Sequence, residues 1–131
     1  MPALHVIDET YIAAAADVVR RRLCDEQVWA RWFPGISLRC REDRGPAGKR
    51  WDVTGDVMGT AEVWLERFGD GVIVHAYLRV DPVRASRSLR RDQRRLQGRY
   101  ALSLKARVRT VKDELEHVAR AAAGGASRPN E

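Results

Sequence analysis

Side chains of the types that transfer protons recur through the middle of the chain, and the candidates are Asp52, Asp56, Glu62, His75, Tyr77 and Tyr100. A general acid or base works best with a pKa near the working pH, and imidazole has the most suitable ordinary value. His75, however, alternates with the apolar Val74 and Ala76, which predicts that it points toward solvent. From this set we keep His75, Asp56 and Tyr100 as the candidate catalytic residues. The chain has no Ser-His-Asp order, no glycine-rich phosphate loop and no nucleophile elbow.

Metal and disulfide chemistry find little support. The only cysteines, Cys24 and Cys40, form no CxxC or Cys/His pattern, so we expect reduced, buried thiols, no metal and no cofactor. The first ten residues include His5, Asp8 and Glu9 and do not form a secretory signal. No apolar run approaches the ~18 residues needed to cross a bilayer. We therefore expect a cytoplasmic protein of one domain.

The net charge of +6 comes mainly from arginines near the C-terminal side. They crowd a segment in which we name as candidate contacts to an anionic surface Arg87, Arg90, Arg91, Arg94 and Arg95. The helix macrodipole disfavours positive charge at a helix N-terminus. A cluster of arginines at this position therefore indicates a binding role for the charge. Anionic lipid and acidic protein faces both attract such clusters. A solvated face partly paired with Glu62, Glu66 and Asp70 is the alternative. No helix-turn-helix or RNA-binding strand signature points to nucleic acid.

Apolar and polar residues alternate in five segments, which predicts strands at 4–12, 36–41, 50–57, 60–68 and 72–80. A turn is expected at Gly45–Ala47 and the following Gly48, and a hairpin at Gly69-Asp70-Gly71. Helical spacing predicts a first short helix at 13–23. Asp25 can cap a second short helix that carries Trp29 and Trp32 and ends at Pro34. Asp81-Pro82 is expected to end the last strand.

A long helix is predicted from about Ser86. One apolar stripe runs along it, formed by Leu89, Leu96, Tyr100, Leu104, Val108, Val111, Leu115 and Val118. Gly98 interrupts this helix and is expected to allow a bend or a close approach to the sheet. Gly124-Gly125 is expected to end it, which leaves 124–131 as a flexible tail after a domain at 1–123.

Strand alternation also nominates the walls of a ligand pocket between the sheet and the helices. The candidates are Trp32, Leu38, Trp51, Val53, Val63, Leu65, Ala76, Leu78, Tyr100 and Leu104. The same alternation is equally typical of residues that simply fill a core. Trp64 and Phe68 fall on the opposite face, where two outward aromatic rings can mark a contact surface. A one-residue shift of that strand would turn Trp64 into the pocket.

The order of these elements resembles the helix-grip fold of the START-like, or SRPBCC, superfamily, in particular its polyketide cyclase/dehydrase and lipid-transport type. The matching residues are Thr10-Tyr11-Ile12-Ala13-Ala14, Asp17-Val18-Val19, Asp25 with Trp29, Trp32 and Pro34, Gly69-Asp70-Gly71-Val72-Ile73-Val74, and Asp113-Glu114-Leu115-Glu116. The family's sheet usually has more strands, so the chain resembles a member shortened by about one hairpin. The resemblance implies an α+β fold with a curved antiparallel sheet wrapped around a long C-terminal helix.

Three functions follow from the residues and the resemblance. The first is a non-catalytic module that binds an apolar or amphipathic small molecule or lipid. The second, which the family name implies, is a polyketide cyclase or dehydratase. The third is an interaction domain without a pocket, whose arginine-rich helix binds an anionic membrane surface or an acidic partner. Exposed sheet edges would also allow an oligomer.

Overall fold

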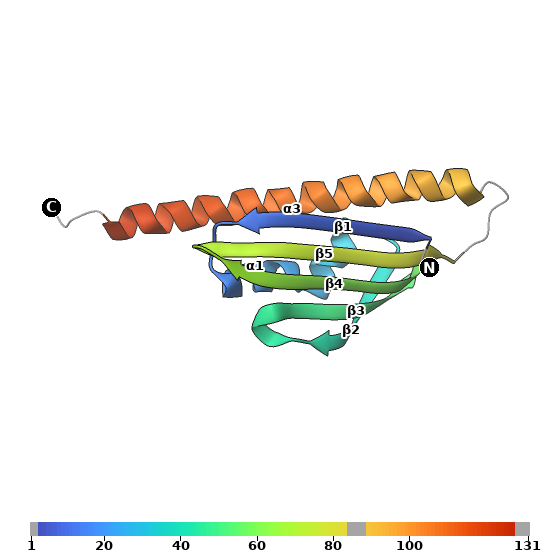
Figure 1. Ribbon diagram of the computed structural model, residues 1–131, viewed down its shortest axis with the longest axis horizontal. Helices are drawn as coiled ribbons and strands as arrows, with labels where there is room; N and C mark the ends of the chain where they lie inside the picture. The colour runs from blue at the N-terminus through green and yellow to red at the C-terminus, as the bar shows by residue number, and fades with distance from the viewer. Residues whose placement is uncertain (1–2, 84–88, 128–131) are drawn as a thin grey trace.

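The structure is a computed structural model that describes residues 3–83 and 89–127. Its elements in chain order are β1 (Leu4–Ile12), α1 (Ala16–Leu23), α2 (Glu26–Trp32), β2 (Ile36–Asp43), a short 3-10 turn (Gly45–Ala47), β3 (Gly48–Gly55), β4 (Val57–Phe68), β5 (Gly71–Pro82) and α3 (Leu89–Ser127). The five strands form one antiparallel sheet in the order β1-β5-β4-β3-β2 (Figure 1). This is the α+β helix-grip arrangement that the sequence predicts.

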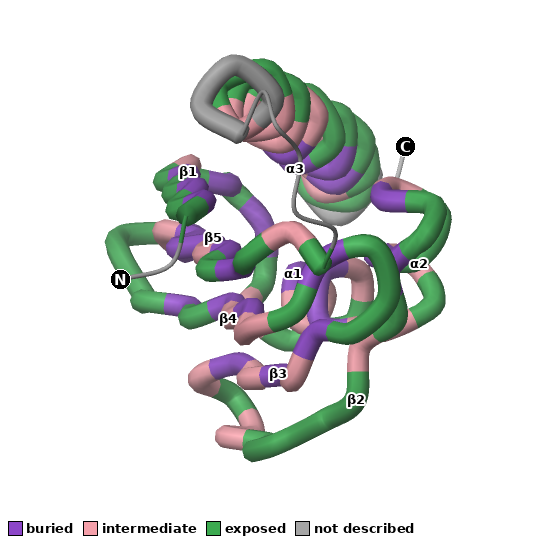
Figure 2. Tube along the Cα trace, turned by 90° about the vertical axis from the view of Figure 1, so that its right-hand side faces the viewer, coloured by how far each residue is buried: buried purple, intermediate pink, exposed green. Residues whose placement is uncertain are grey.

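The sheet is curved, and all three α-helices cover its concave side (Figure 2). Strand alternation explains this, because most inward positions are apolar and buried whereas most outward positions are polar or exposed. The core joins inward residues of all five strands to α1, α2 and the middle of α3. Trp64 and Phe68 lie on the convex side with 39% and 62% of their surface exposed, so the predicted facing of β4 is confirmed.

Several strand boundaries differ from the prediction, and two of the differences involve a glycine or a proline. Val57 begins β4 and does not end β3, because β3 ends at Gly55 and only Asp56 separates the two strands. The backbone of Gly55 has a φ of +116°, a conformation that favours glycine. Asp81 and Pro82 lie within β5, where they pair with Met58 and Val57 of β4. The pairing of β1 with β5 ends at Val80, so no strand on that side needs an N–H from Pro82, and proline is compatible with this end of β5.

The short helices follow their capping signals. Asp25 accepts a hydrogen bond from the Gln27 N–H at 2.9 Å and so caps α2, as predicted. The helix α1 starts at Ala16, three residues later than expected, because Ala15 is still extended. Both cysteines are free thiols, but only Cys24 is buried. The prediction of a buried Cys40 is wrong, since β2 is an edge strand whose second half no helix covers.

The helix α3 runs along β1 and extends beyond the sheet (Figure 1). Its middle buries Leu104, Val108, Val111 and Leu115, while Leu96 and Tyr100 pack partly against the core. Val118 is 62% exposed, so its place in the predicted apolar stripe is wrong. Its neighbour Ala119 packs partly against the core in its place, so the buried face of the helix does not include Val118.

Three further expectations concern α3. It continues through Gly124-Gly125 to Ser127, so the predicted end at these glycines is wrong. Backbone hydrogen bonds can carry a helix through glycine at a cost of about 1 kcal/mol each. Gly98 makes no close approach to the sheet, because a Cβ built there would have nothing within 4 Å. Ser86 and residues 128–131 lie outside the described residues.

Candidate binding site

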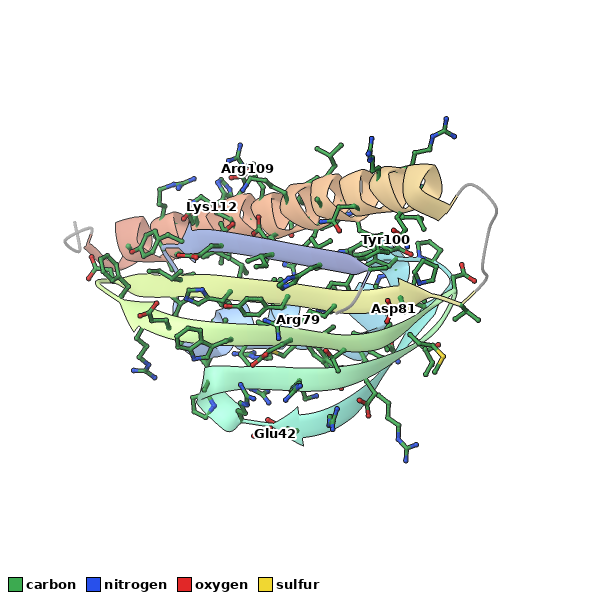
Figure 3. All side chains as sticks on the ribbon, turned by 45° about the vertical axis from the view of Figure 1, so that its right-hand side comes forward. Glu42, Arg79, Asp81, Tyr100, Arg109 and Lys112 are labelled. Carbon is green, nitrogen blue, oxygen red and sulfur yellow. The ribbon has the colours of Figure 1, made fainter. Side chains whose placement is uncertain are left out.

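A pocket of about 230 Å³ lies at one end of the fold, where the end of α2, the turn between β3 and β4, and the first half of α3 meet. Its walls are Trp32, Phe33, Pro34, Asp56, Val57, Leu96, Arg99, Tyr100 and Ser103. The labelled side chain of Tyr100 marks its position beneath α3 (Figure 3). Ligand pockets of this kind combine mainly apolar walls with a few polar groups.

The aromatic wall is held by the packing of α2. Trp29 is fully buried, and its ring Nε1 donates a hydrogen bond of 2.8 Å to the Leu23 carbonyl oxygen. Its ring centroid lies 5.8 Å from those of both Trp32 and Phe33. Phe33 in turn meets Tyr100 edge to face, at 5.4 Å and 83°. This chain of rings fixes the wall that joins α2 to α3.

The acidic wall is held by a close approach of two turns. The Asp56 N–H donates to the Gly35 carbonyl oxygen at 2.9 Å, and the Asp56 carbonyl accepts from the Val83 N–H at 3.1 Å. The Asp56 carboxylate lies so close over Gly35 that a Cβ there would come within 2.2 Å of Oδ2. Gly35 also has a φ of +95°. Both its conformation and this contact therefore require glycine, and they fix the carboxylate at the pocket wall.

The polar groups of the pocket offer complementary hydrogen-bonding roles. Burial raises the pKa of Tyr100, the charge of Asp56 raises it further, and Arg99 opposes this in part. Tyr100 therefore keeps its proton at neutral pH and can donate a hydrogen bond. Within residues 3–83 and 89–127, neither the Tyr100 hydroxyl nor the Asp56 carboxylate has a hydrogen-bond partner. The pocket thus presents a donor, an acceptor and, at Arg99, a cation.

The structure brings together only part of the predicted site. Trp32, Tyr100 and Asp56 line the pocket. Leu38 is half-buried against the core, and the remaining predicted wall residues are buried within it, namely Trp51, Val53, Val63, Leu65, Ala76, Leu78 and Leu104. The described opening therefore lies at the end of the space between sheet and helices.

His75 is on the convex side of the sheet, remote from this pocket. The prediction that it points to solvent is wrong, because only 8% of its surface is exposed. Its ring stacks on Trp64 with centroids 4.4 Å apart, and its Nε2 lies 3.1 Å from a Glu66 oxygen. Glu9 flanks the other ring nitrogen at 3.7 Å. Alternation within β5 predicts the correct face of the sheet for His75. It does not predict the burial of the ring, because the side chains that cover the ring belong to β1 and β4.

The predicted cationic residues are described only in part. Arg94 and Arg95 are exposed on α3. Arg87 lies outside the described residues, and the side chains of Arg90 and Arg91 are not described. The carboxylates of Glu62 and Glu66 pair with Arg44 and His75, and not with those arginines of α3 whose side chains are described.

Some pocket-lining and buried polar positions were not predicted. Phe33, Leu96, Arg99 and Ser103 line the pocket, and a signal existed, since the last three lie within one helical turn of Tyr100. Asp8 is buried, where it accepts hydrogen bonds from Thr10 at 2.7 Å and from Lys105 at 3.2 Å. Its inward position between Val6 and Thr10 could have revealed it.

Two findings concern classes of site. Within the described ranges, no group of three or more His, Cys, Asp or Glu side chains could hold a metal ion. The described helices include none with the length and apolar character of a membrane span.

Comparison with known proteins shows the fold. A crystal structure from Chromobacterium violaceum aligns with a TM-score of 0.58 at 11% identity, over 86% of this chain and 96% of that one. The solution structure of the Aha1 dimer from Colwellia psychrerythraea gives 0.55 at 12% identity, with the same coverage. A START superfamily protein from Mycobacterium smegmatis gives 0.51 at 14% identity, over 87% and 98%. No protein-family model matches the chain, and no curated protein matches it in sequence. The chain therefore has the START-like helix-grip fold.

Proposed function

We propose that this START-like domain binds a small amphipathic molecule in the pocket at the end of the sheet, without transforming it. The observation that carries the proposal is the pairing of an aromatic wall with two polar groups that have no hydrogen-bond partner among the described residues. Trp32, Phe33 and Leu96 supply apolar surface, and burial of ligand surface against them is favourable by about 25 cal/mol per Å². Tyr100 and Asp56 orient the ligand.

The polar groups limit the chemistry of the ligand. A protonated Tyr100 hydroxyl donates to a ligand oxygen, and the Asp56 carboxylate accepts from a ligand hydroxyl or amine. The apolar body of the ligand faces the rings. A pocket of about 230 Å³ is smaller than the ~300–1,000 Å³ typical of drug-sized ligands. We therefore propose a compact ligand, or the head of a longer lipid whose chain leaves past Arg99.

A fluorescence titration with the anionic, amphipathic probe 8-anilinonaphthalene-1-sulfonate tests the binding. Leu96→Trp adds volume to the pocket wall and is expected to weaken binding of the probe at least tenfold. Leu102→Trp is the matched control, because it makes the same change on the exposed side of the same helix. Circular dichroism melting checks that both variants are folded. Equal probe binding by a folded Leu96→Trp variant and the wild type would contradict the proposal.

A polyketide cyclase or dehydratase is the second candidate. It is favoured by the meeting of Asp56 and Tyr100, a base and a proton donor, in one pocket. Cyclisation of a synthetic poly-β-ketone can be followed by the absorbance of the aromatic product. Under this alternative, Asp56→Asn lowers the rate at least 100-fold while probe binding changes little, since general base catalysis contributes about 10²–10⁴-fold. Our proposal expects no rate above the uncatalysed background from either protein.

A further inference from the structure

The helix α3 carries a long stretch of positive charge without acidic residues. Between Asp92 and Asp113 the cations are Arg94, Arg95, Arg99, Lys105, Arg107, Arg109 and Lys112. The structure divides them by direction, because the two lysines turn toward the sheet whereas the arginines do not. This division separates cations with a structural role from cations that are free to bind a partner.

Both lysines have partners on β1 or on α3 itself. The Lys105 ammonium lies 3.2 Å from an Asp8 oxygen. The Lys112 ammonium donates to the Tyr11 carbonyl oxygen and to Glu116, each at 2.7 Å. These contacts fasten the helix to the edge of the sheet, so the lysine charges are already balanced.

The arginines have no such balance. Arg94, Arg95, Arg99, Arg107 and Arg109 are exposed, and none forms an ion pair with another described residue. Figure 3 shows Arg109 on the side of α3 that faces away from the sheet. Arg95, Arg99 and Arg109 recur at i, i+4 and i+14, so they share one outward face of the helix. At 1.5 Å per residue this face extends for roughly 21 Å.

An apolar side chain lies in the middle of this face. Leu102 is 74% exposed, and its position at i+7 from Arg95 places it in the row of arginines. Ala106 continues the row one turn later. The outward face of α3 is therefore a line of guanidinium groups around a protruding leucine. We call these residues, Arg95, Arg99, Leu102, Ala106 and Arg109, the outer row.

We propose that the outer row docks the protein on an anionic lipid membrane, with α3 parallel to the surface. Arginines attract anionic headgroups, and an exposed leucine between them can enter the acyl boundary. A straight helix also presents a linear row that fits a flat surface (Figure 1). Nucleic acid would satisfy the arginines but offers nothing to Leu102, so the membrane is the better match.

This docking would also place the pocket near the lipid. Arg99 belongs to the outer row and to the pocket wall, and Tyr100 and Ser103 adjoin it along the helix. The membrane contact stands without the pocket, however, since it depends only on the outward face of α3. Failure of probe binding would therefore leave this inference intact.

Vesicle sedimentation tests the inference directly. The wild type is expected to bind vesicles that contain phosphatidylserine and not vesicles of phosphatidylcholine alone. The triple variant Arg95→Gln/Arg99→Gln/Arg109→Gln is expected to bind about 100-fold more weakly, because each arginine near an anionic surface contributes about fivefold. Leu102→Gln is expected to weaken binding several-fold at unchanged net charge. Raising the ionic strength from about 0.05 M to 0.5 M should release the wild type, since the Debye length then falls below ~5 Å.

A control variant that loses the same number of positive charges elsewhere distinguishes binding through the outer row from attraction by the net charge of the protein. Arg31→Gln/Arg39→Gln/Arg67→Gln also removes three exposed cations, but from α2, β2 and β4. It is expected to bind vesicles within about threefold of the wild type when salt screens the long-range attraction between the net charge of the protein and the vesicle. Equal losses in both triple variants would overturn the proposal. A second result would also overturn it. This result is tighter binding to a DNA duplex than to vesicles at equal phosphate concentration, with DNA binding that depends on the same arginines and not on Leu102.

Discussion

The side chain of Gln97 forms two hydrogen bonds with the backbone of His5. Its Oε1 accepts from the His5 N–H at 3.0 Å, and its Nε2 donates to the His5 carbonyl oxygen at 2.8 Å. His5 lies on β1, an edge strand of the sheet. Gln97 therefore occupies the place of a neighbouring strand at this residue. Lys112 and Glu116 do the same farther along, at the Tyr11 carbonyl and the Ala13 N–H.

Loss of the Gln97 contact should destabilise the fold and open this edge. Gln97→Ala is expected to lower the free energy of unfolding by about 1–2 kcal/mol, because two backbone groups lose their partner. Urea denaturation measures this change, and faster hydrogen exchange of the His5 amide locates it. Gln93→Ala, one turn earlier on α3, is the control and should change stability by less than about 0.5 kcal/mol. Similar losses in both variants would mean that the contact contributes nothing specific.

Glu26 should make stability depend on pH. Burial raises the pKa of Glu26, but hydrogen bonds from Lys49, from its own backbone N–H and from Trp51 outweigh burial and hold the pKa below its usual value. The contacts to Lys49 and Trp51 are 2.9 Å and 3.1 Å. A lowered folded-state pKa gives stability that is present above the unfolded pKa of about 4.3 and is lost as the pH falls through the folded value.

Glu26→Gln tests this dependence. It is expected to lower the free energy of unfolding by about 1–2 kcal/mol at pH 7, and the difference from the wild type should shrink as the pH falls from about 5 to 2. Denaturant titrations over this range measure it. Glu114→Gln, which removes the exposed pair with Arg22, should cost less than about 0.5 kcal/mol at pH 7. A difference for Glu26→Gln that stays constant with pH would contradict the linkage.

The two thiols should differ strongly in reactivity. Cys40 is exposed on β2, whereas Cys24 is buried and burial raises the pKa of its thiol to about 11. At pH 8 a thiol with that pKa is only about 0.1% thiolate, the reactive form. Iodoacetamide should therefore label the native protein once, at Cys40, as measured by mass spectrometry. Cys40→Ser should take up no label until it is denatured, and native labelling of that variant would show that Cys24 is accessible.

Gly98 should be replaceable with a gain in stability. It lies within α3, outside the left-handed region, and a Cβ there meets nothing within 4 Å. Gly98→Ala is expected to raise the free energy of unfolding by about 0.5–1 kcal/mol, because alanine loses less backbone entropy in a helix. Thermal denaturation by circular dichroism measures the gain.

Gly35→Ala is expected to lower the stability of the protein, because the added methyl group would meet the Asp56 carboxylate. A stable Gly35→Ala protein would contradict the geometry of the pocket wall.

The sequence by itself determined the elements, their order and the sheet. Strand alternation and helical spacing are local properties, so Val74, Ala76 and Leu78 reveal their facing without knowledge of their neighbours. The Asp25 cap and the hairpin at Gly69 are equally local. The facing of Trp64 was not settled in this way, because a one-residue shift of its strand would reverse it.

Only the tertiary structure decided which apolar residues fill the core and which line a pocket. Trp51 and Trp32 look alike in sequence, but Trp51 packs against Trp29 in the core while Trp32 stands at the pocket wall. Burial of His75 likewise depends on Trp64 and Glu66, which lie on another strand. Val118 is exposed whereas its neighbour Ala119 packs partly against the core. The local sequence pattern determines which face of a strand or helix a residue lies on. Contacts between segments distant in the sequence determine what covers that face.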